Sequence, residues 1–213
     1  ISCPGCYPTS ILLPLIPLFK YNAINQKNII IDSKSGYSWA GRGVHFKYKN
    51  KNLYETLSAY GVGFHRHNAE IHQELNKYTK SKMKFIFTPH LTPMFRGILS
   101  TFYIDLKKGF SNKKIYKILK NFYKKNLFIK VLKLNSLIGT NEVINTNNCV
   151  ISICKTKYKN KIIILSAIDN LIKGGAGQAI QNMNIKYGFS INEGLKWKKI
   201  FLYLSCFCLF VVV

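Results

Sequence analysis

Short runs of β-branched and aromatic residues, set apart by polar and glycine-containing segments, constrain the fold of this chain most. Such runs are typical of buried or half-buried strands. The run at 97–106 alternates between apolar and polar residues, as expected for a strand with one face on the core. The runs at 149–154 and 161–167 flank a polar segment and predict a β-hairpin. The predicted strands are 28–32, 84–88, 97–106, 128–134, 149–154 and 161–167.

Helical spacing marks several segments between these strands. Residues 112–123 follow Ser111, a favourable N-cap residue, and place apolar residues at intervals of three and four. Residues 1–20 are expected to form a Cys-containing turn and then a short apolar helix, and the other predicted helices are 53–60, 70–78 and 170–184. With 213 residues the chain is long enough for one domain with its own core. The pattern indicates an α+β fold, with helices on one face of a mixed, largely antiparallel sheet.

The charge balance is strongly basic, with 32 Lys and Arg against 8 Asp and Glu and a formal net charge of +24. This balance is compatible with a nucleic-acid-binding module or with a surface that binds anionic membranes. The lysines are scattered, however, and arginine, which proteins prefer for reading bases and phosphates, is scarce. The lysine excess is therefore interpreted as compositional, and neither nucleic acid nor membrane is expected as a partner.

The chain has six cysteines, and no signal-peptide pattern is recognisable in its N-terminal apolar run. Free thiols in a reducing cytoplasm are expected rather than a disulfide framework. Cys6 lies just ahead of a predicted helix start, where unpaired backbone N–H groups favour a thiolate. Three interpretations stay open: a nucleophile at Cys6, a CxxC redox pair with Cys3, and a structural turn. No metal site is expected, because a second pair of suitable spacing is missing.

Residues 64–67 read Phe-His-Arg-His. A cysteine nucleophile needs an acid or base nearby, and histidine is its usual partner. His65 and His67 are both candidates, because residues far apart in sequence meet in space. The HxH spacing is also compatible with metal ligation, and a polar surface loop is the third alternative.

Each of the scarce arginines lies in a chemically suggestive segment. Arg42 and Arg96 lie in loops rich in Gly or Pro, and Arg66 lies between the two histidines. A guanidinium there suits bidentate capture of a carboxylate or phosphate, or a structural salt bridge. The glycine-rich segment 169–179 is a weak candidate for a phosphate loop, because its spacing matches no nucleotide-binding motif.

Five segments occur in one order along the chain: PGCYPTS, KSG with AGRG, HRHNAEI, FTPHLTPMFRGIL and AIDNLIKGGAGQAIQNMN. Together they resemble the N-acetyl-gamma-glutamyl-phosphate reductase family of the aspartate-semialdehyde dehydrogenase superfamily, over residues 2–195. The resemblance implies an NADP(H)-dependent enzyme of arginine biosynthesis. Such an enzyme reduces N-acetylglutamyl 5-phosphate to the semialdehyde through a cysteine thioester. The resemblance also implies a homo-oligomer and a dinucleotide-binding domain that is missing from this chain.

The same resemblance assigns roles to residues of this chain. Cys6 matches the nucleophile and His65 the acid/base residue, with His67 as the second candidate for that role. The residues expected to contact the substrate or its phosphate are Arg42, Arg66, Arg96, Ser35 and His67. The residues expected on the nicotinamide side are Asn170, Leu171 and Lys173. Cys3 is a departure, because the family usually has Asn at this position.

Residues 1–195 are expected to form the catalytic and dimerisation domain, with a helix at about 170–184 that returns to the nucleotide-binding domain. The apolar run at 196–213 departs from the resemblance and is expected to be an atypical tail. Three other functions remain as alternatives: a related aspartate-semialdehyde dehydrogenase, a basic nucleic-acid-binding module and a CxxC thiol oxidoreductase.

Overall fold

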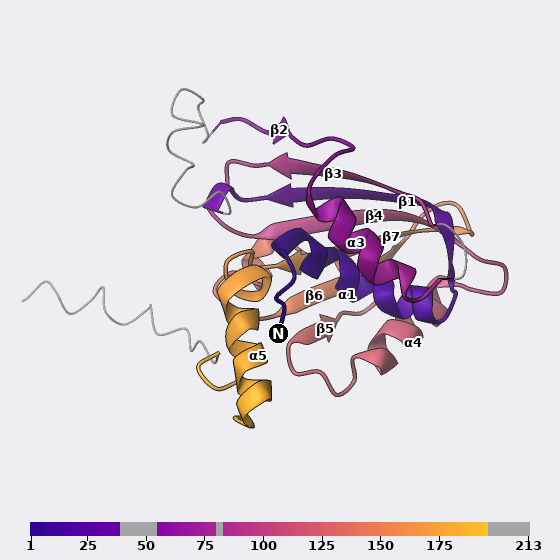
Figure 1. Cartoon of the computed structure of the whole chain (residues 1–213). Helices are drawn as coiled ribbons and strands as arrows, with labels where there is room; N and C mark the ends of the chain where they lie inside the picture. The colour runs from indigo at the N-terminus through magenta and orange to yellow at the C-terminus, as the bar shows by residue number, and fades with distance from the viewer. Residues whose placement is uncertain (39–54, 80–82, 196–213) are drawn as a thin grey trace, which may run out of the picture.

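The fold is built on one sheet of seven strands in the order β2-β3-β1-β4-β7-β6-β5 (Figure 1). It is seen in a computed structural model that describes residues 1–38, 55–79 and 83–195. The strands are β1 (Ile24–Ser35), β2 (Ser58–Ala59), β3 (Phe85–Leu91), β4 (Ile98–Leu106), β5 (Ile129–Val131), β6 (Cys149–Lys155) and β7 (Lys161–Ile168). Only β1–β3 and β5–β6 pair in parallel among the described strands. The predicted mixed, largely antiparallel sheet is confirmed.

Alternation along the strands gives the sheet two different faces. Ile31 of β1 lies opposite Phe102 of β4, and both are fully buried. One residue earlier on β1, Ile30 lies opposite Tyr103, and these side chains are 42% and 45% exposed. A period of two residues produces this contrast, because successive side chains of a strand point to opposite faces. One face therefore carries the core, and the other face is partly open.

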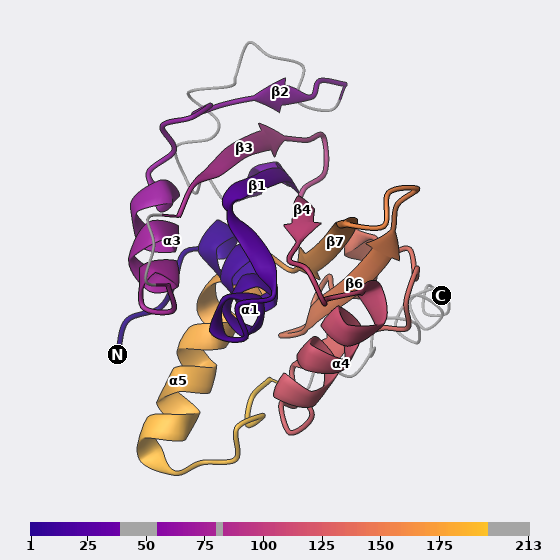
Figure 2. The same cartoon turned by 90° about the vertical axis from the view of Figure 1, so that its right-hand side faces the viewer.

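Helices cover the core face, as Figure 2 shows. The helices of the described residues are α1 (Cys6–Lys20), α3 (His67–Asn76), α4 (Asn112–Phe122) and α5 (Gly177–Tyr187), with the short helical segments η2 (Thr140–Glu142) and η3 (Ile172–Ala176). Buried residues of α1, α3 and α4 join the core face of the sheet in one hydrophobic cluster. The predicted placement of helices on one face is confirmed. None of the helices in the described ranges is long and apolar enough to cross a membrane.

Helix α1 is the central helix, with eleven of its fifteen residues buried. A helix that is apolar on nearly all sides has to be enclosed, and α1 contacts α3, α4 and η3 as well as the sheet. Where α1 crosses the sheet, Ser10 lies 2.8 Å from Ser100, and Ser100 lies 2.7 Å from Ser33. These small side chains let the helix approach the strands, and their hydroxyl groups satisfy one another. The start of α1, at Cys6, is thereby fixed against the sheet.

Some local predictions were wrong. The helix predicted at 53–60 is not found in its described part, where 58–59 form β2. The strand predicted to end before Pro89 continues to Leu91. The Pro89 carbonyl accepts a hydrogen bond from the Tyr60 N–H, so it points toward the short edge strand β2. The N–H that proline lacks would point to the same side, and proline is tolerated where that side faces a sheet edge. The helix predicted at 170–184 begins as η3 and becomes regular only in α5.

Candidate functional site

Cys6 is the first residue of α1, and the extended backbone of Gly5 precedes it. The first turn is closed twice, because the Thr9 N–H and the Thr9 hydroxyl each donate to the Gly5 carbonyl at 2.9 Å. Burial raises the pKa of the Cys6 thiol, and the backbone N–H groups of Cys6 and Tyr7 act in the opposite direction. The sulfur therefore lies where a helix start stabilises a thiolate, but in an environment that discourages free charge.

The imidazole of His67 lies directly against the residue before Cys6. A Cβ atom on Gly5 would lie 2.5 Å from His67 Nε2, so only glycine leaves room for the ring. His67 Nδ1 is buried and has no hydrogen-bond partner among the described residues. Burial lowers the pKa of His67 to about 4, and His65 and Arg66 add to the effect. The ring is therefore neutral near pH 7 and able to accept a proton.

His65 lies beside His67 and contacts Tyr7 rather than Gly5. Its Nδ1 accepts a hydrogen bond from the His67 N–H at 3.2 Å, and the two ring centroids are 4.8 Å apart. The His65 ring also packs edge-on against Tyr7, Tyr60 and Phe87, with a centroid distance of 5.5 Å in each case. Burial and Arg66 lower the pKa of His65 as well. The two predicted candidates are thus brought together, and His67 is the one in contact with Gly5.

Two further groups border Cys6. The carboxylate of Glu70, on α3, accepts the Gly5 N–H at 3.1 Å (Oε1) and 3.3 Å (Oε2). Gly174 of η3 lies so close that a Cβ there would come within 2.7 Å of Cys6 Cβ. The described residues hold no group of three or more His, Cys, Asp or Glu side chains that could bind a metal ion.

The predicted substrate-binding residues differ in placement. Arg66 is exposed at the start of α3, and its positive charge lowers the pKa of Cys6, His65 and His67. Ser35 is fully buried and donates to the Gly36 carbonyl at 3.0 Å, so it belongs to the packing beneath the site. Arg42 lies outside the described residues.

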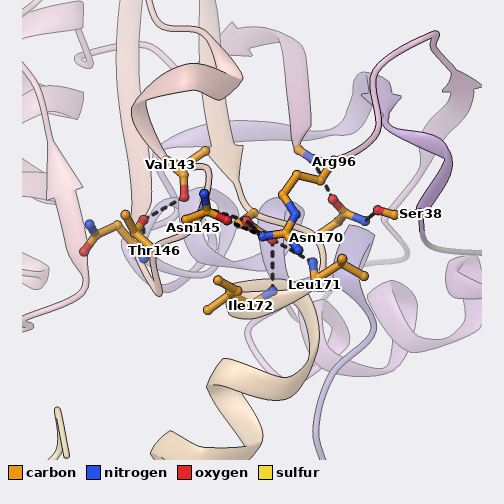
Figure 3. Close-up of polar contacts among 11 residues, drawn as sticks. Ser38, Arg96, Val143, Asn145, Thr146, Asn170, Leu171 and Ile172 are labelled. Atoms are coloured by element: carbon orange, nitrogen blue, oxygen red, sulfur yellow. Dashed lines mark hydrogen bonds and ion pairs between the residues drawn. The ribbon is translucent and has the colours of Figure 1, made fainter. Parts of the chain in front are cut away.

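Arg96 belongs to a network around the buried carboxylate of Asp169, part of which Figure 3 shows. Asp169 Oδ1 accepts the N–H groups of Leu171 at 2.9 Å and Ile172 at 3.0 Å. Its Oδ2 accepts the Asn145 N–H at 2.8 Å and pairs with Arg96 Nη1 at 3.4 Å. Arg96 also donates to the Asn145 side chain. The observed contacts of Arg96 are those of a structural salt bridge, which was one of the two interpretations made from the sequence.

The residues expected on the nicotinamide side are engaged within the chain. Asn170 accepts the Gly97 N–H at 2.6 Å and donates to the Ser38 hydroxyl at 2.9 Å (Figure 3). The Leu171 N–H is bound to Asp169. The buried Lys173 donates to Gln181 at 2.9 Å. The Asn170 and Lys173 side chains and the Leu171 N–H thus have partners within the chain, and their place on the nicotinamide side stays a prediction.

Neither Asp169, which binds several groups beside the site, nor Gln178, which contacts the segment before Cys6, was singled out from the sequence. Asp169 had a usable signal, because it directly precedes a helical segment whose first N–H groups need an acceptor. Gln178 contacts residues at the other end of the chain, and no local pattern indicates such a contact.

Comparison with known proteins places this geometry in a family. Residues 6–170 match the family model described as "Semialdehyde dehydrogenase, dimerisation domain", and the chain belongs to this family. A protein of Thermoanaerobacter pseudethanolicus named N-acetyl-gamma-glutamyl-phosphate reductase is 48% identical over 195 residues, which cover 92% of this chain and 56% of that protein. A protein of Arabidopsis thaliana named "Probable N-acetyl-gamma-glutamyl-phosphate reductase, chloroplastic" is 44% identical over 205 residues, 94% of this chain and 50% of that protein.

Solved structures agree on the fold. A probable aspartate-semialdehyde dehydrogenase from Pseudomonas aeruginosa aligns with a TM-score of 0.67 and 13% identity, over 89% of this chain and 63% of that one. The resemblance stated from the sequence is confirmed at the level of family and fold. The chain spans only about half the length of the two curated relatives, 56% and 50%.

Proposed function

We propose that this chain carries the acyl-transfer site of an N-acetyl-gamma-glutamyl-phosphate reductase, with Cys6 as nucleophile and His67 as its acid/base partner. The position of Cys6 carries the proposal. It begins α1, next to a glycine that the imidazole of His67 contacts. The names of relatives at 44% and 48% identity support the same substrate class, N-acetylglutamyl 5-phosphate.

In the proposed reaction, the neutral His67 imidazole accepts the Cys6 thiol proton as the sulfur attacks the acyl carbon. A carbon–sulfur bond forms, and the acyl carbon–oxygen bond to phosphate breaks. The phosphate leaves with the electron pair of that bond, and the imidazolium returns its proton to it. Arg66 is exposed beside these groups and suits the phosphate or a substrate carboxylate. His65 holds the His67 segment through its bond to the His67 N–H.

Reduction of the resulting thioester requires a hydride, which NADPH supplies in the reaction that the family resemblance implies. No residue of this chain is assigned to that step, because Asn170, Leu171 and Lys173 are engaged in contacts of their own. The proposed pathway is arginine biosynthesis, and a reducing cytoplasm is the proposed setting. The four described cysteines are all free, which is compatible with that setting.

A homo-oligomer is part of the proposal, since the matching family model is that of a dimerisation domain. The open face of the sheet is the surface we assign to it. Ile86, Ile30 and Tyr103 form one row across three strands and are 61%, 42% and 45% exposed. A row of large apolar side chains on a sheet face is stabilised when a second copy covers it.

The test joins this chain to the part of the Thermoanaerobacter relative that the match does not cover, where the family resemblance implies the nucleotide-binding domain. We expect phosphate-dependent NADP reduction with N-acetylglutamate 5-semialdehyde, and little with aspartate semialdehyde. Cys6→Ser should lower turnover by about 10³-fold or more, because a hydroxyl is a far weaker nucleophile than a thiolate. Cys149→Ser is the matched control and should retain turnover. Normal turnover in Cys6→Ser would exclude the covalent mechanism.

A further inference from the structure

The peptide group between Pro4 and Gly5 is held at both of its polar ends. Its N–H, on Gly5, donates to Glu70 of α3 at 3.1 Å, and its carbonyl, on Pro4, accepts from Gln178 Nε2 of α5 at 2.9 Å. The N–H and the carbonyl of one planar trans peptide group point in opposite directions. Two bonds from opposite sides therefore resist rotation of the peptide plane. The next peptide group along the chain, between Gly5 and Cys6, carries the N–H of the residue that begins α1.

Gln178 also reaches into the first turn of α1. Its Nε2 donates to Thr9 Oγ1 at 3.1 Å, and the Thr9 hydroxyl in turn donates to the Gly5 carbonyl at 2.9 Å. Gln178 is only 8% exposed, so its amide lies inside the protein and does not face solvent. One buried amide group thus links the segment before Cys6 to the turn that follows it.

The same helix and the segment before it hold this region at two more places. Asn182, one turn after Gln178 on α5, donates to Cys3 Sγ at 3.4 Å. Gly174, in η3 just before α5, packs against the Cβ atom of Cys6. Figure 1 shows the N-terminal segment running beside α5 into α1. Helix α5 and the segment before it therefore contact the start of α1 and the residues preceding it at several points.

We propose that Gln178 is a positioning residue for the Cys6 nucleophile. Its amide holds the first turn of α1 in the orientation that directs the backbone N–H groups of Cys6 and Tyr7 toward the sulfur. This inference rests on the proposed function of Cys6. Gln178 does not touch the sulfur, since its two donor contacts are the Pro4 carbonyl and the Thr9 hydroxyl, which in turn binds the Gly5 carbonyl.

The orientation matters because those backbone N–H groups lower the pKa of the Cys6 thiol against the effect of burial. The other charged groups that act on the thiol are Arg66, which lowers its pKa, and Glu70, which raises it. The titratable rings nearby are those of His67 and Tyr7. Gln178 donates to none of these four residues, and its variants leave all four unchanged in sequence, so a change in thiol titration reports on the first turn of α1.

The test is the pH dependence of Cys6 alkylation by iodoacetamide in the full chain, in a Cys3→Ser background. Mass spectrometry of the peptide that contains Cys6 follows the reaction. The midpoint of the profile reports the thiol pKa, and the plateau at high pH reports access to the sulfur. Gln178→Met keeps the length of the side chain and removes both donor contacts. We expect its midpoint to rise by about 0.5 to 1 unit, which is a three- to tenfold loss of thiolate at a fixed pH below the midpoint. The matched control is Gln73→Met, at an exposed position of α3, and its midpoint should stay at the wild-type value.

A midpoint in Gln178→Met equal to that of Gln73→Met would overturn the inference. If circular dichroism shows Gln178→Met to be unfolded, Gln178→Asn takes its place, because its amide is one methylene too short to keep both contacts. The same rise is expected for it, and an unchanged midpoint contradicts the inference in the same way. If Cys6 of the Cys3→Ser parent is not alkylated at any pH, the proposed nucleophile is wrong and the inference falls with it. If Cys6 is reactive but the midpoint is unchanged, only the positioning role of Gln178 is excluded, and the proposed nucleophile stands.

Discussion

The surroundings of the half-buried Cys6 and of the fully buried Cys149 show how two thiols acquire different chemistry. Cys149 begins β6, is fully buried and interacts with the Ser166 hydroxyl at 3.5 Å. Burial raises the pKa of Cys149 to about 11. Burial raises the pKa of Cys6 as well, but Cys6 has the N–H groups of a helix start and an imidazole beside the preceding glycine. Burial alone therefore makes a thiol inert, and the helix start and histidine distinguish the candidate nucleophile.

Lys173 does not change this conclusion for Cys149, although its charge favours the thiolate. Burial lowers the pKa of Lys173 itself, so the cation that would stabilise a thiolate is disfavoured too. Its ammonium group donates to Gln181 and lies 5.6 Å from the ring centroid of Phe128. We interpret this region as part of the packing beneath β6.

The largest expected effect separates the two histidines beside Cys6. His67→Asn, in the chain joined to a nucleotide-binding domain, should lower kcat/KM by about 100-fold or more, because it removes the group that accepts the thiol proton. His65→Asn should have a smaller effect, since His65 acts on the His67 backbone. Initial-rate kinetics of both variants provide the measurement. A larger loss in His65→Asn would restore the assignment made from the sequence.

A smaller effect is expected on the Cys149 side of the comparison. Cys149→Ala should reduce the free energy of unfolding by about 1 to 2 kcal/mol, because it leaves a small cavity in the core face of the sheet. Urea denaturation measures the loss, and Cys154→Ala, at a half-buried position of the same strand, is the control with a smaller loss. Cys6 alkylation should be unchanged in both variants. A Cys149 variant that loses Cys6 reactivity would show that the two regions are coupled.

A further expected effect is a pH dependence of stability. The pKa of His67 is lowered to about 4 from its usual 6.5, so between these values the unfolded chain binds more protons than the folded one. Stability is therefore expected to fall as the pH is lowered from 6.5 toward 4. Melting temperatures at pH 7.5, 6, 5 and 4.5 measure this trend. His67→Asn should show a shallower decline, and an identical slope in the variant would argue against a buried, neutral imidazole.

Local periodicity explains why much of the fold was predictable. The strand at 97–106 and the helix at 112–123 appear as β4 and α4, because their apolar spacing follows from the faces they bury. Tertiary context decided the other cases. Pro89 stays within β3 because the position of its missing N–H faces the two-residue edge strand β2, which residues 58–59 form instead of a helix.

The candidate site was predictable in its residues but not in its contacts. Cys6 and the two histidines stand out by residue type and motif, and the structure brings His67 to the Cys6 segment. The bonds from Gln178 to Pro4 and from Arg96 to Asp169 span 174 and 73 positions. No sequence pattern encodes such pairings, which depend on how α5 and the 139–146 segment pack. For the same reason, the sequence left the choice between the two histidines open.

The most direct test of the central claim is acylation of the chain by acetyl phosphate, a small acyl phosphate. Tandem mass spectrometry of the tryptic peptide that ends at Lys20 locates the acetyl group, and release by hydroxylamine identifies a thioester. We predict an acetyl thioester on Cys6, no such adduct in Cys6→Ser, and an unmodified Cys149. A thioester on Cys149, or a Cys6 that alkylates readily but is never acylated, would contradict the account.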